Sequence, residues 1–165
     1  MNKLFNYLKT LGIEEKPGRG HYQHSPAEFT RQLCGDPSYF NNAPNFTYYR
    51  ALITWNYREA TPENVREFEQ QEKKLKTYCK KYGYILEVSY FYGDRVATIE
   101  SSADAETAAN YFYFRDASVK EFEQMQHEYY TTGRHDEVNA ATLEIMNKYG
   151  ELYKEFLRNT EAKTA

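Results

Sequence analysis

The spacing of apolar residues changes in the middle of the chain, and this change restricts the folds that the sequence can adopt. Over residues 46–57 apolar and aromatic side chains alternate with polar ones, which is the period of a β-strand. Residues 61–82 then place their apolar side chains three and four positions apart, as an amphipathic helix does. Two strand-like segments, 84–92 and 95–100, and a second helical segment, 101–114, follow. The middle of the chain therefore predicts the order strand, helix, strand, strand, helix.

This order is that of the first five elements of a ferredoxin-like βαββα layer, whose helices pack on one face of a small mixed or antiparallel sheet. We therefore expect an α+β fold and a single domain that spans all 165 residues. Residues 1–45 are expected to form an N-terminal extension of helices and loops, and residues 46–116 the βαββα core. Residues 117–158 are expected to form a C-terminal helical hairpin, and residues 159–165 a frayed tail.

Local capping and turn signals set the expected boundaries of the remaining elements. Residues 25–28, with the sequence SPAE, resemble a helix start and predict a short helix that ends near Gly35. Residues 93–94 predict a two-residue hairpin turn. A second capping box at residues 118–121 (SVKE) predicts that one helix ends before it and that another begins there. Residues 2–11 predict one more short helix with its apolar side chains on one face.

The charge of the chain argues against a general nucleic-acid-binding protein. Lys and Arg total 21 and Asp and Glu 24, for a net charge of −3, whereas proteins that depend on phosphate contacts are basic overall. Several lysines lie in the second half of helix 61–82, where cations suit the helix dipole, and we interpret them as a solvated helix end. They are Lys73, Lys74, Lys76, Lys80 and Lys81.

Two further features bear on where the protein works. No segment approaches the ~20 apolar residues that a membrane span requires, so we expect no membrane contact. Only Cys34 and Cys79 are present, far apart in the sequence, and we expect both to be reduced thiols. Together these features predict a cytoplasmic protein.

A search for catalytic, metal-binding and cofactor-binding motifs finds none that is specific. The glycine-rich segment 18–20 lacks the third glycine and the Lys-Ser/Thr pair of a nucleotide-binding loop. His21 and His24 could contribute to a metal site with Cys34, but a fourth ligand is not evident. Cys79 falls on the apolar face of its helix, where it is expected to behave as a small hydrophobic residue. We therefore expect no catalytic residue, no cofactor and no metal ion.

The unusual feature of the composition is its 17 tyrosines. Tyr82 and Tyr149 fall on apolar helical stripes and are assigned to the core. Others occur in pairs or runs, such as residues 111–114, that cannot all face one side of a strand or helix. Exposed tyrosines are frequent in interface hot spots because the ring is large and has few rotamers to lose. The predicted partner-binding residues are Tyr48, Arg50, Tyr90, Tyr92, Tyr111, Tyr113 and Tyr130.

These features predict a non-catalytic protein-binding inhibitor or regulator. It would dock a tyrosine-rich, acidic surface on a larger basic protein, one that handles nucleic acid. Small acidic domains without motifs are common among phage and mobile-element inhibitors of host defence, including anti-CRISPR proteins. Size and composition, not any shared motif, suggest that class.

Two other functions and one assembly stay open. The first is single-stranded nucleic-acid binding through the sheet face around Tyr48, Arg50 and Glu87, which the acidic balance opposes. The second is a hydrolase that depends on histidine. Its candidate residues are His21, His24, His127 and His135. The C-terminal helices could also pair two copies of the chain in a homodimer, because Tyr153 and Leu157 widen their apolar face.

Overall fold

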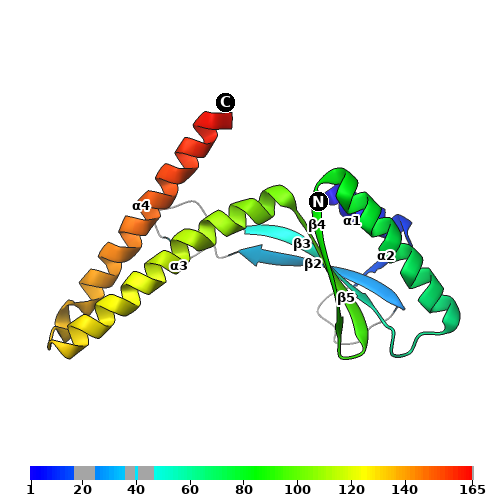
Figure 1. Cartoon of the computed structure of the whole chain (residues 1–165), viewed down its shortest axis with the longest axis horizontal. Helices are drawn as coiled ribbons and strands as arrows, with labels where there is room; N and C mark the ends of the chain where they lie inside the picture. The colour runs from blue at the N-terminus through cyan, green and yellow to red at the C-terminus, as the bar shows by residue number, and fades with distance from the viewer. Residues whose placement is uncertain (17–24, 36–39, 41–46, 165) are drawn as a thin grey trace. The chain divides into compact units, whose positions relative to one another are not determined.

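A computed structural model describes the chain except for residues 17–24, 36–39, 41–46 and 165. The chain folds into two compact units (Figure 1). Unit 1 comprises Met1–Cys34 and Tyr48–Ala105, and unit 2 comprises Gly35–Thr47 and Glu106–Ala165. The protein is thus a mixed α+β chain with a five-stranded sheet.

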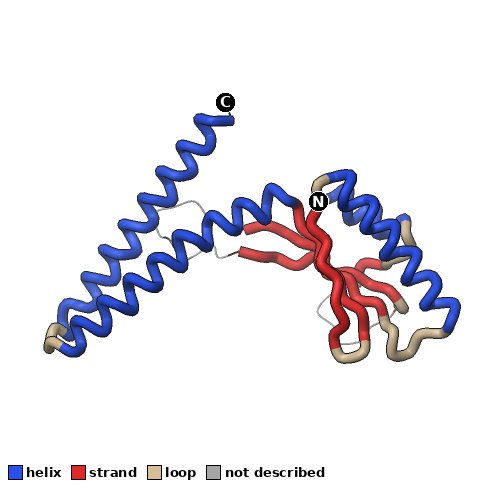
Figure 2. Tube along the Cα trace, viewed as in Figure 1, coloured by secondary structure: helices blue, strands red, loops and turns tan. Residues whose placement is uncertain are grey.

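Unit 1 contains a mixed sheet with the strand order β1-β2-β3-β5-β4. Its elements are α1 (Asn2–Thr10), β1 (Glu14–Glu15), β2 (Ala27–Gly35), β3 (Thr47–Trp55), α2 (Pro62–Tyr82), β4 (Tyr84–Phe91) and β5 (Asp94–Ser101). β1 runs parallel to β2, whereas β5 pairs antiparallel with both β3 and β4. Figure 2 shows the strands in red and the helices in blue.

The predicted order of the middle of the chain is present as β3, α2, β4 and β5. α2 connects two parallel strands, β3 and β4, and β5 lies between them, which makes a split βαβ unit. The neighbour of β3 on its other side is β2, which precedes it in the chain. The full ferredoxin-like layout is not confirmed, because that layout would place a strand from later in the chain, and not β2, beside β3.

The predicted helix over residues 25–35 is wrong, because this segment forms β2. The capping-box contact is nevertheless made: the Ser25 backbone N–H donates to the Glu28 carboxylate at 2.6 Å. The chain continues as a strand: Ala27 and Phe29 belong to the hydrophobic core, whereas Glu28 between them is buried but lies outside that core, a period of two. Pairing with β1 and β3 satisfies the backbone of this strand.

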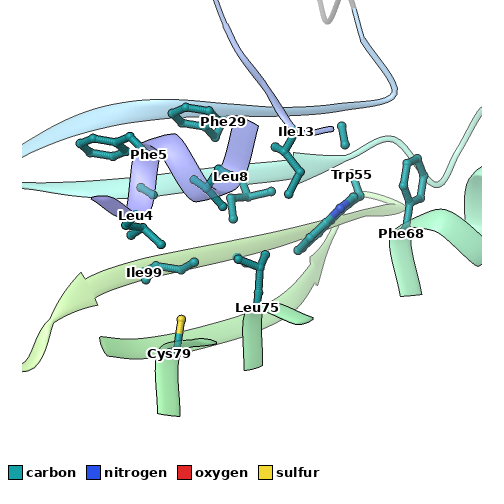
Figure 3. Close-up of a cluster of buried hydrophobic side chains, with 14 residues drawn as sticks. Leu4, Phe5, Leu8, Ile13, Phe29, Trp55, Phe68, Leu75, Cys79 and Ile99 are labelled. Atoms are coloured by element: carbon teal, nitrogen blue, oxygen red, sulfur yellow. The ribbon is translucent and has the colours of Figure 1, made fainter. Parts of the chain in front are cut away.

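The core of unit 1 lies between α1, α2 and one face of the sheet (Figure 3). Its largest buried side chains are Leu4, Leu8, Ile13, Phe29, Ile53, Trp55, Phe68, Leu75 and Ile99. Gln71 of α2 is buried among them, although its residue type is polar. The Trp55 indole N–H donates to Gln71 Oε1 at 3.0 Å, and Gln71 Nε2 donates to the Leu11 carbonyl at 3.0 Å. One side chain thus joins β3, α2 and the end of α1.

Unit 2 consists mainly of an antiparallel pair of helices, α3 (Ser102–Thr131, whose first turn belongs to unit 1) and α4 (Val138–Thr164). A 3-10 turn, η1 (His135–Glu137), lies between them. The helical hairpin was predicted, but the helix break at residue 118 was not found. Ser118 is buried inside α3, and its hydroxyl donates to the Arg115 carbonyl at 2.8 Å. Most of the segment predicted as a frayed tail lies within α4, which continues to Thr164.

Candidate interaction surface

The β4–β5 hairpin ends in a tight turn made by Tyr92 and Gly93. Phe91 pairs with Asp94 in the ladder, so the turn lies one residue earlier than the predicted 93–94. Both turn residues have positive φ, 49° for Tyr92 and 87° for Gly93, as a type I′ hairpin turn requires. Tyrosine is an unusual residue in this conformation, which Asn or Gly adopts more easily. The position therefore carries a ring where a smaller residue would suit the backbone better.

Three consecutive aromatic side chains project from this hairpin, and we call Tyr90, Phe91 and Tyr92 the aromatic tip. Their exposed fractions are 68%, 61% and 82%. The Phe91 and Tyr92 rings meet edge-on with 4.5 Å between their centres, whereas Tyr90 lies on the opposite face of β4 and contacts Tyr57. Scattered single hydrophobic residues are normal on a surface, but here both faces of the hairpin end carry exposed aromatic rings. The prediction included Tyr90 and Tyr92. Phe91 was missed as a site residue, although the sequence run YFY contained it.

Arg58 and Asp94 hold the turn in place. The Arg58 guanidinium donates twice to the Asp94 carboxylate, at 3.2 and 3.1 Å. The Asp94 residue is buried, so this bidentate pair is protected from water on one side. The stem of Arg58 lies against the turn, since a Cβ added to Gly93 would be 2.7 Å from Arg58 Cγ. Glycine is therefore needed at position 93 both for φ and for space.

The first ring of the tip, Tyr90, rests on a second charged pair. The Arg95 guanidinium lies 4.6 Å from the centre of the Tyr90 ring, and the Tyr57 ring meets it edge-on at 6.2 Å. Arg95 in turn forms an ion pair with Glu72 of α2, and Lys76 binds the same carboxylate at 3.1 Å. The hydrogen bond from Arg95 holds the pKa of Glu72 below its ordinary value. Tyr90 is thus anchored to the body of unit 1.

β4 is also the edge strand of the sheet in the part of the chain that the structure describes. Its exposed side chains on the face away from the helices are Ile85, Glu87, Ser89 and Phe91. An edge strand presents backbone donors and acceptors to a partner strand, and proteins usually protect such an edge with lysine, proline or a bulge. The β4 sequence YILEVSYF contains neither lysine nor proline. Glu87 is the one charged residue of β4, so little within the strand itself opposes strand addition.

Tyr48 and Arg50, two other predicted site residues, lie on the sheet face opposite the core of unit 1. The Tyr48 hydroxyl donates to the Glu100 carboxylate at 2.9 Å, and burial raises the pKa of Tyr48 above its ordinary value. Arg50 Nε donates to Gln32 Oε1 at 2.7 Å. Glu87 lies on the same face. Both predicted residues are thus held by neighbours, and the carboxylates beside them oppose a phosphate backbone.

The other predicted residues belong to unit 2, and one of them is not at the surface. Tyr111 is 1% exposed and its ring packs against Phe40 at 5.6 Å and Tyr153 at 5.4 Å, so it cannot contact a partner. Tyr113 and Tyr130 are exposed, 71% and 49%. The sequence could not assign Tyr111, because its partners lie about 70 residues before it and 42 after it in the chain.

The two tyrosines assigned to the core have different outcomes. Tyr82 is 55% exposed, so its assignment was wrong: the buried stripe of α2 ends at Cys79. Tyr149 is half-buried beside the unit 2 core, and its hydroxyl donates to Glu121 at 2.6 Å. Glu121 was predicted to cap a helix, but it binds Tyr149 and Lys148 across the helical hairpin instead.

The candidate catalytic and metal-binding residues are not gathered in the described part of the chain. His127 and His135 are exposed, and the His135 ring lies 5.2 Å from that of Tyr130. His21 and His24 lie outside the described residues. Among the residues that are described, no group of three or more His, Cys, Asp or Glu could hold a metal ion. Cys79 is buried as predicted, and burial raises the pKa of its thiol to about 11.

A scan of protein-family models, a search of curated proteins and a search of solved structures each found no match to this chain. None of the helices within the described residues is long and apolar enough to cross a membrane.

Proposed function

We propose that the chain is a non-catalytic protein-binding module that docks the β4–β5 hairpin on a larger partner. The observation that supports this most directly is the aromatic tip, whose three rings are more than half exposed yet stand on a braced turn. Rings that are already fixed lose little conformational entropy when they bind. Tyrosine and other aromatic residues dominate the energetics of protein interfaces for this reason.

Two kinds of contact combine at this hairpin. The tip supplies apolar area, and the edge of β4 supplies a row of backbone hydrogen-bonding groups for an added strand. Side chains at alternate positions of β4 would then meet the partner on one face. A surface with both features suits a protein partner better than a small molecule, because the strand edge needs the backbone of another chain to pair with it.

Charge supports a basic partner. The exposed face of β4 carries Glu87, and β5 adds Glu100 to the same face. Asp94, in the same strand, is already neutralised by Arg58. A basic surface opposite these carboxylates would gain favourable electrostatics and faster association. The narrower expectations, a partner that handles nucleic acid and an anti-CRISPR or other phage inhibitor, stay predictions.

The test is a comparison of two full-length variants as baits. Phe91→Ser with Tyr92→Asn removes two rings of the tip and places Asn-Gly, a favoured I′ sequence, in the turn. Tyr113→Ser with Tyr130→Ser removes two exposed rings from unit 2 and serves as the matched control. We expect the tip variant to lose its partner and the control to keep it. With a purified partner, the dissociation constant should rise by roughly 30-fold or more.

Three results would contradict the proposal. The first is a partner that binds the tip variant as well as it binds the wild type. The second is loss of the partner in the unit 2 variant only, which would move the docking surface to α3 and α4. The third is a dimer of the purified chain that breaks apart in the tip variant, because β4 would then pair with a second copy of itself. Light scattering after size-exclusion chromatography detects this last case.

A further inference from the structure

A second surface of unit 1 combines aromatic rings with lysines. It is a depression of about 680 Å³ between α1 and α2, and we call it the Tyr–Lys groove. Its lining residues are Tyr7 of α1 and Gln70, Lys73, Lys74, Thr77, Tyr78, Lys81 and Tyr82 of α2. The α2 members recur at three- and four-residue steps, so they form one continuous side of that helix. The volume lies within the range of ligand-binding clefts.

The three tyrosine rings of the groove form a row of ring contacts that we call the platform, and the ring at one end of it is exposed. Tyr7 and Tyr78 are stacked nearly parallel, with 4.0 Å between their centres and 10° between their planes. Tyr82 lies 4.6 Å from Tyr78 and is tilted by 48°. Tyr78 is half-buried, whereas Tyr82 is 55% exposed at the last residue of α2. The platform thus ends in an accessible ring, against which another flat ring could stack.

The charges of the groove are of one sign. Lys73, Lys74 and Lys81 are exposed, and no ion pair involves them among the described residues. Lys81 Nζ instead lies 5.2 Å from the centre of the Tyr82 ring. The described lining contains no carboxylate, whereas Lys76, elsewhere on α2, is paired with Glu72 at 3.1 Å. In a chain of net charge −3, this is a local reversal of charge.

We propose that the Tyr–Lys groove binds single-stranded nucleic acid, with a base on Tyr82 and phosphates at the three lysines. Every base has a π-face that can stack on tyrosine, and lysines beside such a ring can follow the phosphates. A duplex does not suit the site, because its bases are already stacked on each other. The helix-end interpretation of the lysines accounts for their charge but not for the exposed ring and hollow beside them. This proposal is independent of the hairpin surface.

The expected binding is weak and depends on salt. If three phosphates are neutralised, log K falls with log salt with a slope of about −2 for a single strand. Raising the salt from about 50 to about 200 mM should then weaken binding roughly 20-fold. One stacked base adds about 1–3 kcal/mol, which corresponds to roughly 5- to 150-fold in affinity.

The experiment uses the full chain and fluorescein-labelled oligo(dT) and oligo(U) of about six nucleotides, a length within the usual single-strand site size. Fluorescence anisotropy is measured over a salt series. Lys74→Gln with Lys81→Gln should weaken binding at least 5-fold at low salt and flatten the salt slope. The control, Lys76→Gln with Lys80→Gln, removes the same charge from lysines outside the groove and should change affinity by less than about 2-fold.

A second pair of variants tests the stacked base. Tyr82→Ala should weaken binding at least 5-fold without changing the salt slope, because only the ring is lost. Tyr82→Phe keeps the ring and should bind like the wild type. Thermal unfolding followed by the fluorescence of Trp55, the only tryptophan, shows whether each variant is folded.

Several outcomes would overturn the proposal. One is the absence of oligonucleotide binding by the wild type at low salt. Another is equal loss in the groove and control lysine variants, which would indicate a general charge effect. A third is binding of a poly-glutamate peptide as tight as that of the oligonucleotides, with Tyr82→Ala unchanged. The groove would then recognise acidic protein segments by charge alone.

Discussion

Replacement of Gln71 by methionine should destabilise unit 1 although it fills nearly the same space. The Trp55 indole N–H is fully buried and donates to Gln71 Oε1, and methionine offers no comparable acceptor. A buried donor left without a partner costs about 1–3 kcal/mol. The Leu11 carbonyl also loses its donor, at about 1 kcal/mol, and the gain in apolar burial offsets part of the sum. We expect a net loss of about 2 kcal/mol.

Urea unfolding followed by Trp55 fluorescence measures this loss, since the single tryptophan reports on unit 1. With a slope of about 2 kcal/mol per molar, the midpoint should fall by about 1 M. Gln70→Met is the matched control, because Gln70 is the exposed neighbour on the same helix and should change stability by less than about 0.5 kcal/mol.

A double-mutant cycle separates the hydrogen bond from the packing of each residue. Trp55→Phe combined with Gln71→Met removes both partners, so no indole N–H is left unpaired. By circular dichroism, the double variant should be more stable than the sum of the single losses predicts, by about 1–2 kcal/mol. A Gln71→Met protein as stable as the wild type, or a cycle without coupling, would refute the network as a source of stability.

Two more predictions concern the hairpin and its support. Gly93→Ala should lower the free energy of unfolding by about 1–2 kcal/mol. The loss should exceed that of Gly133→Ala, because Gly133 has a similar positive φ but no atom within 4 Å of an added Cβ. Equal losses in thermal unfolding would show that Arg58 does not crowd the turn. The pKa of Glu72 in the folded chain lies below its ordinary value of 4.5. Ionised Glu72 therefore adds to the free energy of unfolding above pH 4.5, and this stabilisation is lost as the pH falls through the folded pKa. Glu72→Gln should therefore cost about 1–2 kcal/mol at pH 7 and flatten the acid side of the stability profile, and an unchanged profile would contradict this assignment.

The sequence predicted the elements that local period and capping determine together. A clear period and separate end signals mark the strand over 46–57, the helix over 61–82 and the hairpin that follows. The structure has these elements as β3, α2, β4 and β5. The two wrong helix starts, at residues 25 and 118, arise from capping boxes whose contacts serve another purpose. Residues 25–28 make the box hydrogen bond at the start of a strand, and Ser118 lies within a continuous helix.

The candidate surfaces were harder to predict, because exposure depends on contacts between distant segments. Tyr90 and Tyr92 could be selected from sequence, since three aromatic residues beside a turn cannot all be buried. Tyr111 could not be rejected without knowing that Phe40 and Tyr153 surround it. The Tyr–Lys groove needed Tyr7 of α1 beside α2, a contact between residues 71 positions apart.

β4 connects the two proposed binding surfaces, because a tyrosine near each of its ends lies beside one of them. Its first residue, Tyr84, lies 6.1 Å from Tyr78 of the groove, and near its other end Tyr90 begins the aromatic tip. A protein that handles nucleic acid could therefore meet the hairpin while its single strand reaches the groove. The two contacts can be separated experimentally: nuclease treatment should remove only the contribution of the groove, whereas loss of the tip should abolish the complex with or without nuclease. Complete dissociation by nuclease alone would instead show that the nucleic acid, and not the hairpin, holds the partner.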